Sequence, residues 1–335
     1  MAVDRIAAFR AEDCFSVRLV PLAEEADGST APSLLVPEPE LGRRPVGLTR
    51  QFLEDAPVYA SRYTATEYFA ALIRNALERC GIELVAPLVL DIGSGSGNSV
   101  LPCLELFPDC RIVATDLSPD LLRILGRHIA ALGAGDRVAL VCVDATRDLY
   151  RAERFDLVIG AAILHHLIDP EAAIRGALRA LRPGGRAIFF EPFEAGNAVL
   201  RLAYEEILRE AERGARLDAR VRRLLVALVE DFRVRAGSDK SAPLYAQIDD
   251  KWLFTRSHLE EMAARGGARA VLSYPLHDVA SPFTHQTVTN LRLGAELPRD
   301  ALAPWAWAIL HRYDTAFSTE QKRDLPIEGA IVLTK

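Results

Sequence analysis

Residues 84–100 read LVAPLVLDIGSGSGNSV, an apolar run followed by glycines on alternate positions. The run has the length of one strand and does not alternate with polar residues, which is typical of a strand buried on both faces in a parallel sheet. Gly93, Gly95 and Gly97 follow it directly. Because glycine costs backbone entropy wherever it sits, this spacing predicts a turn that needs positive φ or a ligand lying against bare backbone.

Strand and helix patterns alternate downstream of these glycines. Further strands are predicted at 110–117 (CRIVATDL), 137–145 (RVALVCVDA), 155–163 (FDLVIGAAI) and 185–193 (GRAIFFEPF). Helices are predicted to begin at Ser118 and Asp169, each an N-cap residue followed by proline. The order predicts an α/β fold, a doubly wound, mostly parallel seven-stranded sheet with helices on both faces.

Three stretches depart from this alternation. Residues 1–60 are predicted to be an N-terminal cap or linker, because 14–22 (CFSVRLVPL) alternates like a strand but 26–45 is rich in turn formers. Residues 61–335 form the main domain, with helical insertions expected at about 196–250 and 277–326. Strands at 268–276 and 329–335 complete the sheet and are expected to pair antiparallel. Capping boxes are predicted at Thr64/Glu67 and at Ser257/Glu260.

Composition limits the classes of partner. Half of the 335 residues are apolar, enough for a full core. The net charge of −6 gives no basic field for duplex DNA or an anionic membrane. Five cysteines without CxxC spacing indicate neither a disulfide framework nor a thiolate metal site. The first residues are charged and no apolar segment reaches the roughly 18 residues that span a bilayer, so we expect a cytoplasmic protein. A homodimer stays open.

The glycine spacing separates two kinds of nucleotide ligand. The pattern here is GxGxG, and Asn98 occupies the position that would complete the GxGxxG dinucleotide fingerprint. No Gly-Lys-Ser/Thr follows, which excludes a P-loop. Asp116 ends the next predicted strand, where a carboxylate can accept hydrogen bonds from both hydroxyls of a ribose. A tight turn without a ligand stays open as the alternative.

Five segments in this order resemble the motifs of the class I S-adenosylmethionine-dependent methyltransferases, over most of positions 60–276 and the last strand. They are LDIGSGSGN, TDLSPDLL, VDA, FDLVIGAAILHHL and LRPGGRAIFFEP. The resemblance implies S-adenosyl-L-methionine as cofactor and a Rossmann-like methyltransferase fold. It also implies roles by position: Asp91 near the methionine ammonium, Gly93, Gly95 and Gly97 along that moiety, Asp116 on the ribose, Asp144 on the adenine amino group, Leu117 and Ala145 against the ring, and Ala161 near the sulfonium.

Two histidines follow the fourth predicted strand and suit proton transfer. A sulfonium methyl is already electrophilic, so the enzyme mainly aligns a nucleophile and excludes water; a hydroxyl nucleophile benefits from a base. His165 can act as that base, with Glu191 at the end of the next strand orienting the imidazole. ILHHLID is similar to the catalytic segment of small-molecule O-methyltransferases, although His166 here follows where they carry an acid or amide. Alternatively, His165 packs under the cofactor and closes the loop.

The sequence predicts methyl transfer to a small-molecule acceptor, with a natural-product or sugar hydroxyl favoured. Transfer to nitrogen or carbon, a non-catalytic cofactor-binding partner and a nicotinamide oxidoreductase stay open. No metal is expected, because the spacing of His258, His277, His285 and His311 supports no site with His165 or His166. Large apolar residues of the insertions are expected either to cover the acceptor or to form core or a dimer surface. They are Trp305, Trp307, Tyr204 and Tyr245.

Overall fold

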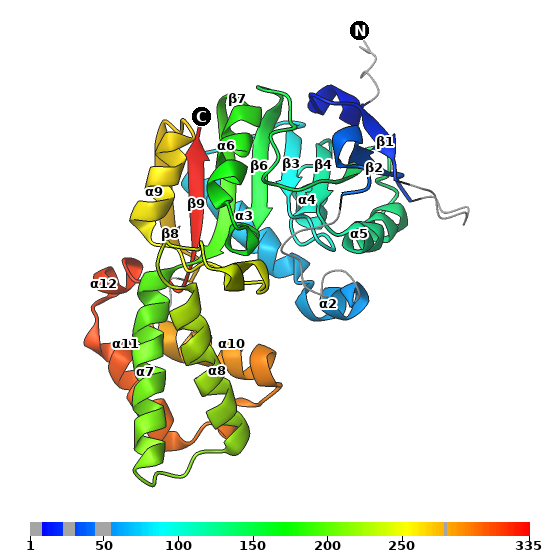
Figure 1. The fold of residues 1–335 in the computed structure, drawn as a ribbon. Helices are drawn as coiled ribbons and strands as arrows, with labels where there is room; N and C mark the ends of the chain where they lie inside the picture. The colour runs from blue at the N-terminus through cyan, green and yellow to red at the C-terminus, as the bar shows by residue number, and fades with distance from the viewer. Residues whose placement is uncertain (1–8, 23–30, 44–54, 278–279) are drawn as a thin grey trace.

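The computed structural model describes residues 9–22, 31–43, 55–277 and 280–335. The charged N-terminal residues 1–8 and the expected linker at 23–30 and 44–54 lie outside the described residues, as do 278 and 279. Figure 1 shows a sheet covered by helices on both faces, with a bundle of helices attached at one end of it. The α/β architecture agrees with the prediction.

The described strands form one sheet of nine. Their bounds are β1 Leu19–Pro21, β2 Leu34–Pro37, β3 Leu88–Ile92, β4 Arg111–Asp116, β5 Val138–Cys142, β6 Phe155–Ala161, β7 Leu181–Pro192, β8 Ala270–Pro275 and β9 Glu328–Thr334. The spatial order is β1-β2-β5-β4-β3-β6-β7-β9-β8. β3 pairs parallel with β4 on one side and with β6 on the other, so the strand order reverses at β3, where open parallel sheets bind ligands. β8 and β9 pair antiparallel, as predicted.

The prediction of seven strands is wrong, because the N-terminal segment adds two more, β1 and β2. Leu34 and Leu35 pair parallel with Leu140 and Val141 of β5, and β1 pairs antiparallel with β2. The prediction of a loop or linker is therefore wrong for residues 34–37. The prolines and glycines around this strand indicate turns, but the free edge of β5 provides hydrogen-bond partners that no local pattern reveals.

Helices cover both faces of the sheet. Those flanking it are α2 Ala56–Tyr63, α3 Thr66–Arg79, α4 Val100–Leu106, α5 Pro119–Ala131, α6 Pro170–Ala180 and α9 Arg256–Arg265. Val89 packs in the core layer shared with α3, α4 and α5, whereas its neighbour Leu90 packs in the layer shared with α6 and α9. The strand is buried on both faces, as its apolar run predicts.

The N-caps test the predicted helix starts. Ser118 accepts a hydrogen bond from the backbone N–H of Leu121, and Asp169 accepts one from that of Ala172, as predicted. The capping box at Thr64/Glu67 is wrong, because the Thr64 hydroxyl instead bonds the Ala60 carbonyl. The box at Ser257/Glu260 is also wrong, because α9 begins earlier and is capped by Thr255.

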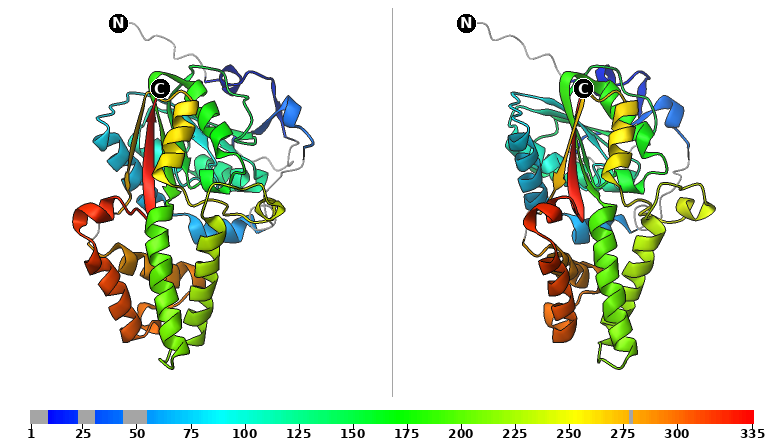
Figure 2. Two further views of the ribbon diagram at one scale, coloured as in Figure 1. Left: turned by 60° about the vertical axis from the view of Figure 1, so that its left-hand side comes forward. Right: turned by 90° about the vertical axis from the view of Figure 1, so that its left-hand side faces the viewer.

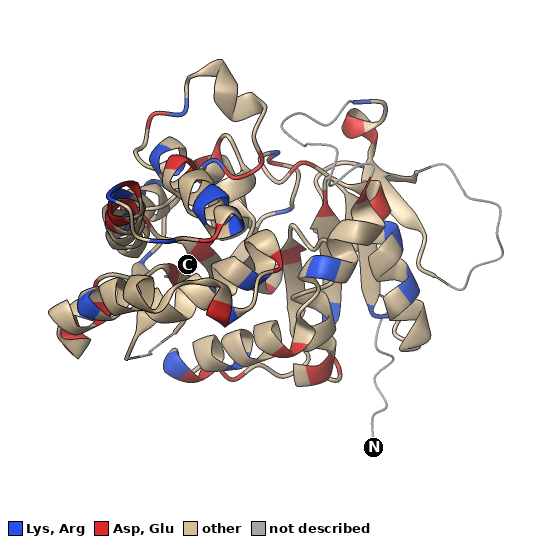
Figure 3. Cartoon of the chain, turned by 90° about the horizontal axis from the view of Figure 1, so that it is seen from below, with Lys and Arg blue, Asp and Glu red and all other residues tan. Residues whose placement is uncertain are grey.

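The insertions build a separate helical core below the sheet (Figure 2). Its helices are α7 Glu194–Glu212, α8 Ala219–Arg235, α10 Pro282–Ala295, α11 Pro304–Ala316 and α12 Thr319–Arg323. Short 3₁₀ turns complete the chain: η1 Ala11–Cys14, η2 Glu38–Glu40, η3 Leu164–His166, η4 Pro243–Ala246 and η5 Arg299–Ala301. No helix within the described ranges has the length and apolar character to cross a bilayer. Figure 3, a view from below, shows basic and acidic residues interspersed over the helices on this side of the molecule.

Candidate functional site

A cavity of about 320 Å³ opens beyond the carboxyl ends of β3, β4, β5 and β6. Eight of the residues singled out from the sequence line it: Gly93, Gly95, Asp116, Leu117, Asp144, Ala145, Ala161 and His166. The other lining residues are Tyr59, Ser94, Ser96, Asn98, Leu121, Val143, Thr146, Ala162, Ile163, Leu167, Ile168, Asp169 and Asp249. Its volume lies in the range of small-molecule and cofactor sites.

The three glycines of the turn after β3 all have positive φ, of +72°, +50° and +115° in sequence order. A Cβ at Gly93 would lie 2.6 Å from the Ile163 side chain, and one at Gly97 would lie 2.8 Å from that of Leu125. Gly95 has no atom within 4 Å of its Cβ position and lines the cavity. Backbone conformation therefore requires glycine throughout the turn, and at Gly95 bare backbone is also open to a ligand.

Asp116 holds two cavity loops together. One carboxylate oxygen accepts from the backbone N–H of Gly95 at 2.8 Å, and the other accepts from that of Ser118 at 2.7 Å. Burial raises the pKa of Asp116, and these two hydrogen bonds act in the opposite direction. Asp144, at the next strand end, accepts from the backbone N–H and hydroxyl of Thr146.

Asp91, at the end of β3, lies beneath the glycine turn and is almost fully buried. Neither carboxylate oxygen has a hydrogen-bond partner among the described residues. Burial raises the pKa of this carboxyl to about 6, although the nearby Ser94 and Ser99 lower it. A buried carboxylate without a partner is costly, and a cationic group from outside the chain would offset that cost.

Glu191, at the end of β7, organises the turn η3. Its carboxylate accepts from the backbone N–H groups of Ile163, Leu164 and His165, at 2.7–3.2 Å. It also lies 2.6 Å from Nδ1 of His165, so this nitrogen carries the proton and donates. The sequence prediction that Glu191 contacts His165 is therefore met in the structure, but most of the carboxylate's bonds are to backbone. Burial lowers the pKa of His165, and its neighbour His166 lowers it further.

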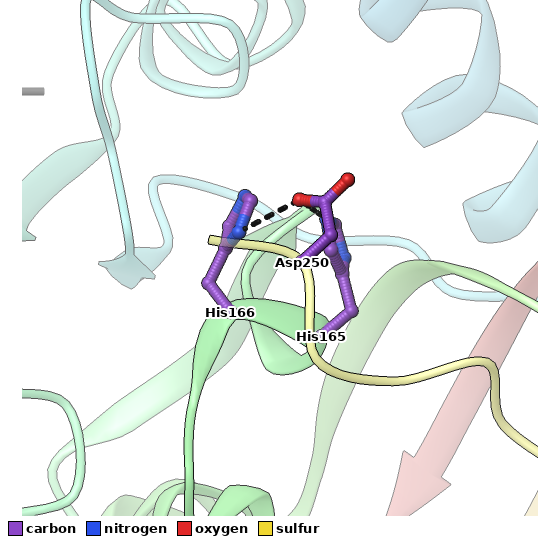
Figure 4. A group of neighbouring side chains, drawn as sticks. All are labelled: His165, His166 and Asp250. Carbon is purple, nitrogen blue, oxygen red and sulfur yellow. Dashed lines mark ion pairs between the residues drawn. The ribbon is translucent and has the colours of Figure 1, made fainter. Parts of the chain in front are cut away.

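His166 lines the cavity, whereas His165 does not. The Nδ1 atom of His166 lies 3.2 Å from the carbonyl oxygen of Asp249 and 3.2 Å from Oδ1 of Asp250 (Figure 4). Burial opposes protonation of His166, but the hydrogen bond and charge of Asp250 outweigh it and raise the pKa. Burial acts to raise the pKa of Asp250, but the hydrogen bond with His166 and the charges of His165 and Arg235 hold it well below its usual range.

The sequence analysis missed Asp249 and Asp250, which lie in the segment between α8 and α9. They belong to no motif, and only the acidic pair before Lys251 and Trp252 distinguishes the stretch. Ligand-type atoms of His165, His166 and Asp250 lie within 4.8 Å of one another, the one such group in the described part of the chain. Arg235 contacts the same carboxylate at 3.4 Å, and its charge disfavours a metal cation there.

The other singled-out residues lie elsewhere. His258 packs beside Trp252, and His277 packs beside His285, so these distal histidines do not join η3. Tyr204 is fully buried in the helical core, where its hydroxyl bonds Thr287. The remaining large residues do not line the cavity: Trp305 and Trp307 pack against the same core, and the Tyr245 hydroxyl donates to the Val234 carbonyl.

Part of the chain is similar to known methyltransferases. A model described as a methyltransferase domain matches residues 89–185. A ubiquinone/menaquinone biosynthesis C-methyltransferase of Pseudomonas fluorescens is 30% identical over 133 residues, which cover 39% of this chain and 52% of that protein. A demethylmenaquinone methyltransferase of Mycolicibacterium paratuberculosis is 34% identical over 123 residues, 37% of this chain and 49% of that protein. The chain thus spans about half the length of the curated relatives it matches.

A solved structure supports the same fold. Phosphoethanolamine N-methyltransferase 2 of Haemonchus contortus, in complex with phosphomonomethylethanolamine and S-adenosylhomocysteine, superposes with a TM-score of 0.50. It is 17% identical, and the match covers 85% of this chain and 59% of that one. The matched domain includes the glycine turn and the strands β3 to β6 that border the cavity. Residues 89–185 are thus similar to a methyltransferase domain, and the chain has the fold of an S-adenosylmethionine-dependent methyltransferase.

Proposed function

We propose that this protein transfers a methyl group from S-adenosyl-L-methionine to a hydroxyl of a small-molecule acceptor. The observation that carries the cofactor assignment is the unpartnered, buried carboxylate of Asp91 beneath a glycine turn that Asp116 holds at the same cavity. When bound, the cofactor supplies an electrophilic methyl group on a sulfonium. Asp91 would meet its ammonium, Asp116 its ribose and Asp144 its adenine edge.

Cofactor affinity is expected to fall below about pH 6 through Asp91. An ammonium favours the ionised carboxylate, whose pKa in the free protein is raised to about 6. Full affinity is therefore present above that pH and decreases about tenfold per pH unit below it. Calorimetric titration with S-adenosylhomocysteine between pH 5 and 8 measures this. Asp91→Asn should bind weakly at pH 8 and show no such decrease; the same pH dependence in the variant would contradict the assignment.

The two histidines of η3 supply the proton acceptor for the hydroxyl in this proposal. His166 reaches the cavity, while His165 stands behind it, bonded to Glu191. A neutral imidazole at the cavity wall can accept the proton that the acceptor hydroxyl loses as it attacks the methyl group. The inserted segment that contributes Asp249 covers this part of the site and helps exclude water.

Carbon methylation is the second candidate, because the curated relatives named above include C-methyltransferases. The acceptor atom can be read from the product. The protein is incubated with a panel of phenols and sugars and with cofactor that carries ¹³C in its methyl group. The chemical shift of the transferred methyl carbon shows whether it is bound to oxygen, nitrogen or carbon. A label on oxygen supports the proposal, and a label on carbon replaces it with the second candidate.

Binding alone separates the remaining classes of function. We expect S-adenosylhomocysteine to bind and NADH not to bind in calorimetry with the full chain. Binding of NADH without the thioether would overturn the methyltransferase proposal. Tight thioether binding with no labelled product on any acceptor would favour a non-catalytic partner.

A further inference from the structure

Two histidines stand side by side in η3, and a different carboxylate contacts Nδ1 of each. Oδ1 of Asp250 also lies 3.5 Å from Nε2 of His165. His165 donates to Glu191, which comes from the sheet, and His166 faces Asp250, which comes from the segment inserted between α8 and α9. The ring centroids of the histidines lie 4.0 Å apart, yet only His166 lines the cavity. A proton-accepting role therefore fits the second pair better than the first.

We propose that Asp250 is a positioning residue that fixes His166 with its proton on Nδ1 and its lone pair on Nε2, ready to accept a proton. The inference rests on the proposed function, because the proton comes from the acceptor hydroxyl. Both neighbours of Nδ1, the Asp249 carbonyl and the Asp250 carboxylate, are acceptors. Neither can bond to an unprotonated nitrogen, so the geometry selects one tautomer.

The two residues that follow Asp250 tie the inserted segment to η3 and to Leu167 directly after it. The backbone N–H of Lys251 donates to the His165 carbonyl at 2.7 Å, and the Trp252 indole donates to the Leu167 carbonyl at 2.7 Å. The ammonium of Lys251 donates to the carbonyls of Ile248 and Asp249. These bonds fix the carboxylate relative to the imidazole, as a preorganised site requires.

Arg235 of α8 orients the carboxylate itself. Its guanidinium lies 3.4 Å from Oδ2 of Asp250 and 3.0 Å from Asp231, and it donates to the Trp252 carbonyl. Because Arg235 contacts Oδ2, the other oxygen of Asp250, Oδ1, faces the two histidines. The helical insertion thus completes the site: α8 supplies the arginine, and the segment after it supplies the aspartate.

Several charged groups surround His166 besides Asp250. The titratable or charged neighbours from the other elements are Asp116 at the end of β4, His165 in η3, Glu191 at the end of β7, Arg235 in α8, and Tyr59 of α2, which lines the same cavity. The Asp250 carboxylate hydrogen-bonds the imidazole of His166 through Nδ1. A substitution that removes this carboxylate is therefore the most direct test of what fixes the tautomer of His166.

The tautomer and pKa of His166 can be measured without an acceptor, by long-range ¹H–¹⁵N spectra of the full chain labelled with ¹⁵N-histidine. His166→Gln assigns the signal. We expect the Nδ1–H form in the wild type. In Asp250→Asn, Arg235 draws the amide oxygen and turns the NH₂ toward His166, so we expect less Nδ1–H form and a pKa lower by about 1 or more. Asp239→Asn, in an exposed part of the same segment, should change neither.

Turnover provides the second readout. Asp250→Asn should lower kcat/KM about 100-fold or more at unchanged affinity for S-adenosylhomocysteine, and Asp250→Glu should recover part of it. The Nε2–H form in the wild type, or an unchanged spectrum in Asp250→Asn, would overturn this inference alone. So would a Co²⁺ titration whose visible absorption depends on Asp250, since that identifies a metal ligand. Failure of the thioether to bind would instead overturn the proposed function.

Discussion

Replacing Asp116 with alanine is expected to weaken binding of S-adenosylhomocysteine by about 100-fold or more. The complex would lose the charged hydrogen bonds between this carboxylate and the ribose, each worth roughly 1.5–3 kcal/mol. Every 1.4 kcal/mol changes the affinity about tenfold. The variant also releases the backbone N–H groups of Gly95 and Ser118, which Asp116 holds at 2.8 and 2.7 Å. The glycine turn therefore loses the contact that links it to the end of β4.

Calorimetry with the full chain measures the change. Asp116→Asn keeps one acceptor oxygen and should show an intermediate loss. Asp120→Ala removes a carboxylate four positions later, on a half-exposed helix position paired with Arg123, and should bind like the wild type. Affinity within a few-fold of wild type in Asp116→Ala would mean that the adenosyl group binds elsewhere, and the assignment of this cavity would be wrong.

The central sheet could be predicted because its strands have local signatures. Buried parallel strands such as β3 and β6 appear as apolar runs of strand length, and proline after a capping residue marks α5 and α6. β2 has no such signature. It forms because Leu34 and Leu35 complete the edge of β5, more than a hundred residues later, which outweighs the surrounding turn formers.

The residues proposed to hold the cofactor could be found from the sequence for the same reason. Its residues stand directly after strands, and the carboxyl ends of parallel strands meet at one edge. Asp250 could not be found this way, because it follows η4 in an irregular segment and reaches His166 only through tertiary packing. The failed capping box at Thr64 has a similar cause: the hydroxyl finds better partners in Ala60 and in Ser96 of the glycine turn.

Replacing Glu191 with alanine is expected to lower the free energy of unfolding by about 3 kcal/mol or more. The buried carboxylate accepts from the three consecutive backbone N–H groups of Ile163, Leu164 and His165, at the start of η3, and from the Nδ1–H of His165. Its loss leaves these buried donors without an acceptor, and each unsatisfied donor costs about 1–3 kcal/mol, less where water enters. Glu191→Gln keeps one acceptor oxygen but turns an NH₂ group toward other donors, so the expected loss is smaller, about 1–2 kcal/mol.

Urea unfolding followed by circular dichroism gives the three free energies, with Glu212→Ala as the control. Glu212 is exposed at the end of α7, so its loss should leave stability within about 0.5 kcal/mol. The experiment also separates two roles of Glu191. If Glu191→Ala is as stable as wild type yet loses methyl transfer, the carboxylate serves to orient His165 for catalysis. A large loss of stability instead identifies Glu191 as the residue that holds η3 in place, which leaves proton acceptance to His166 at the cavity wall.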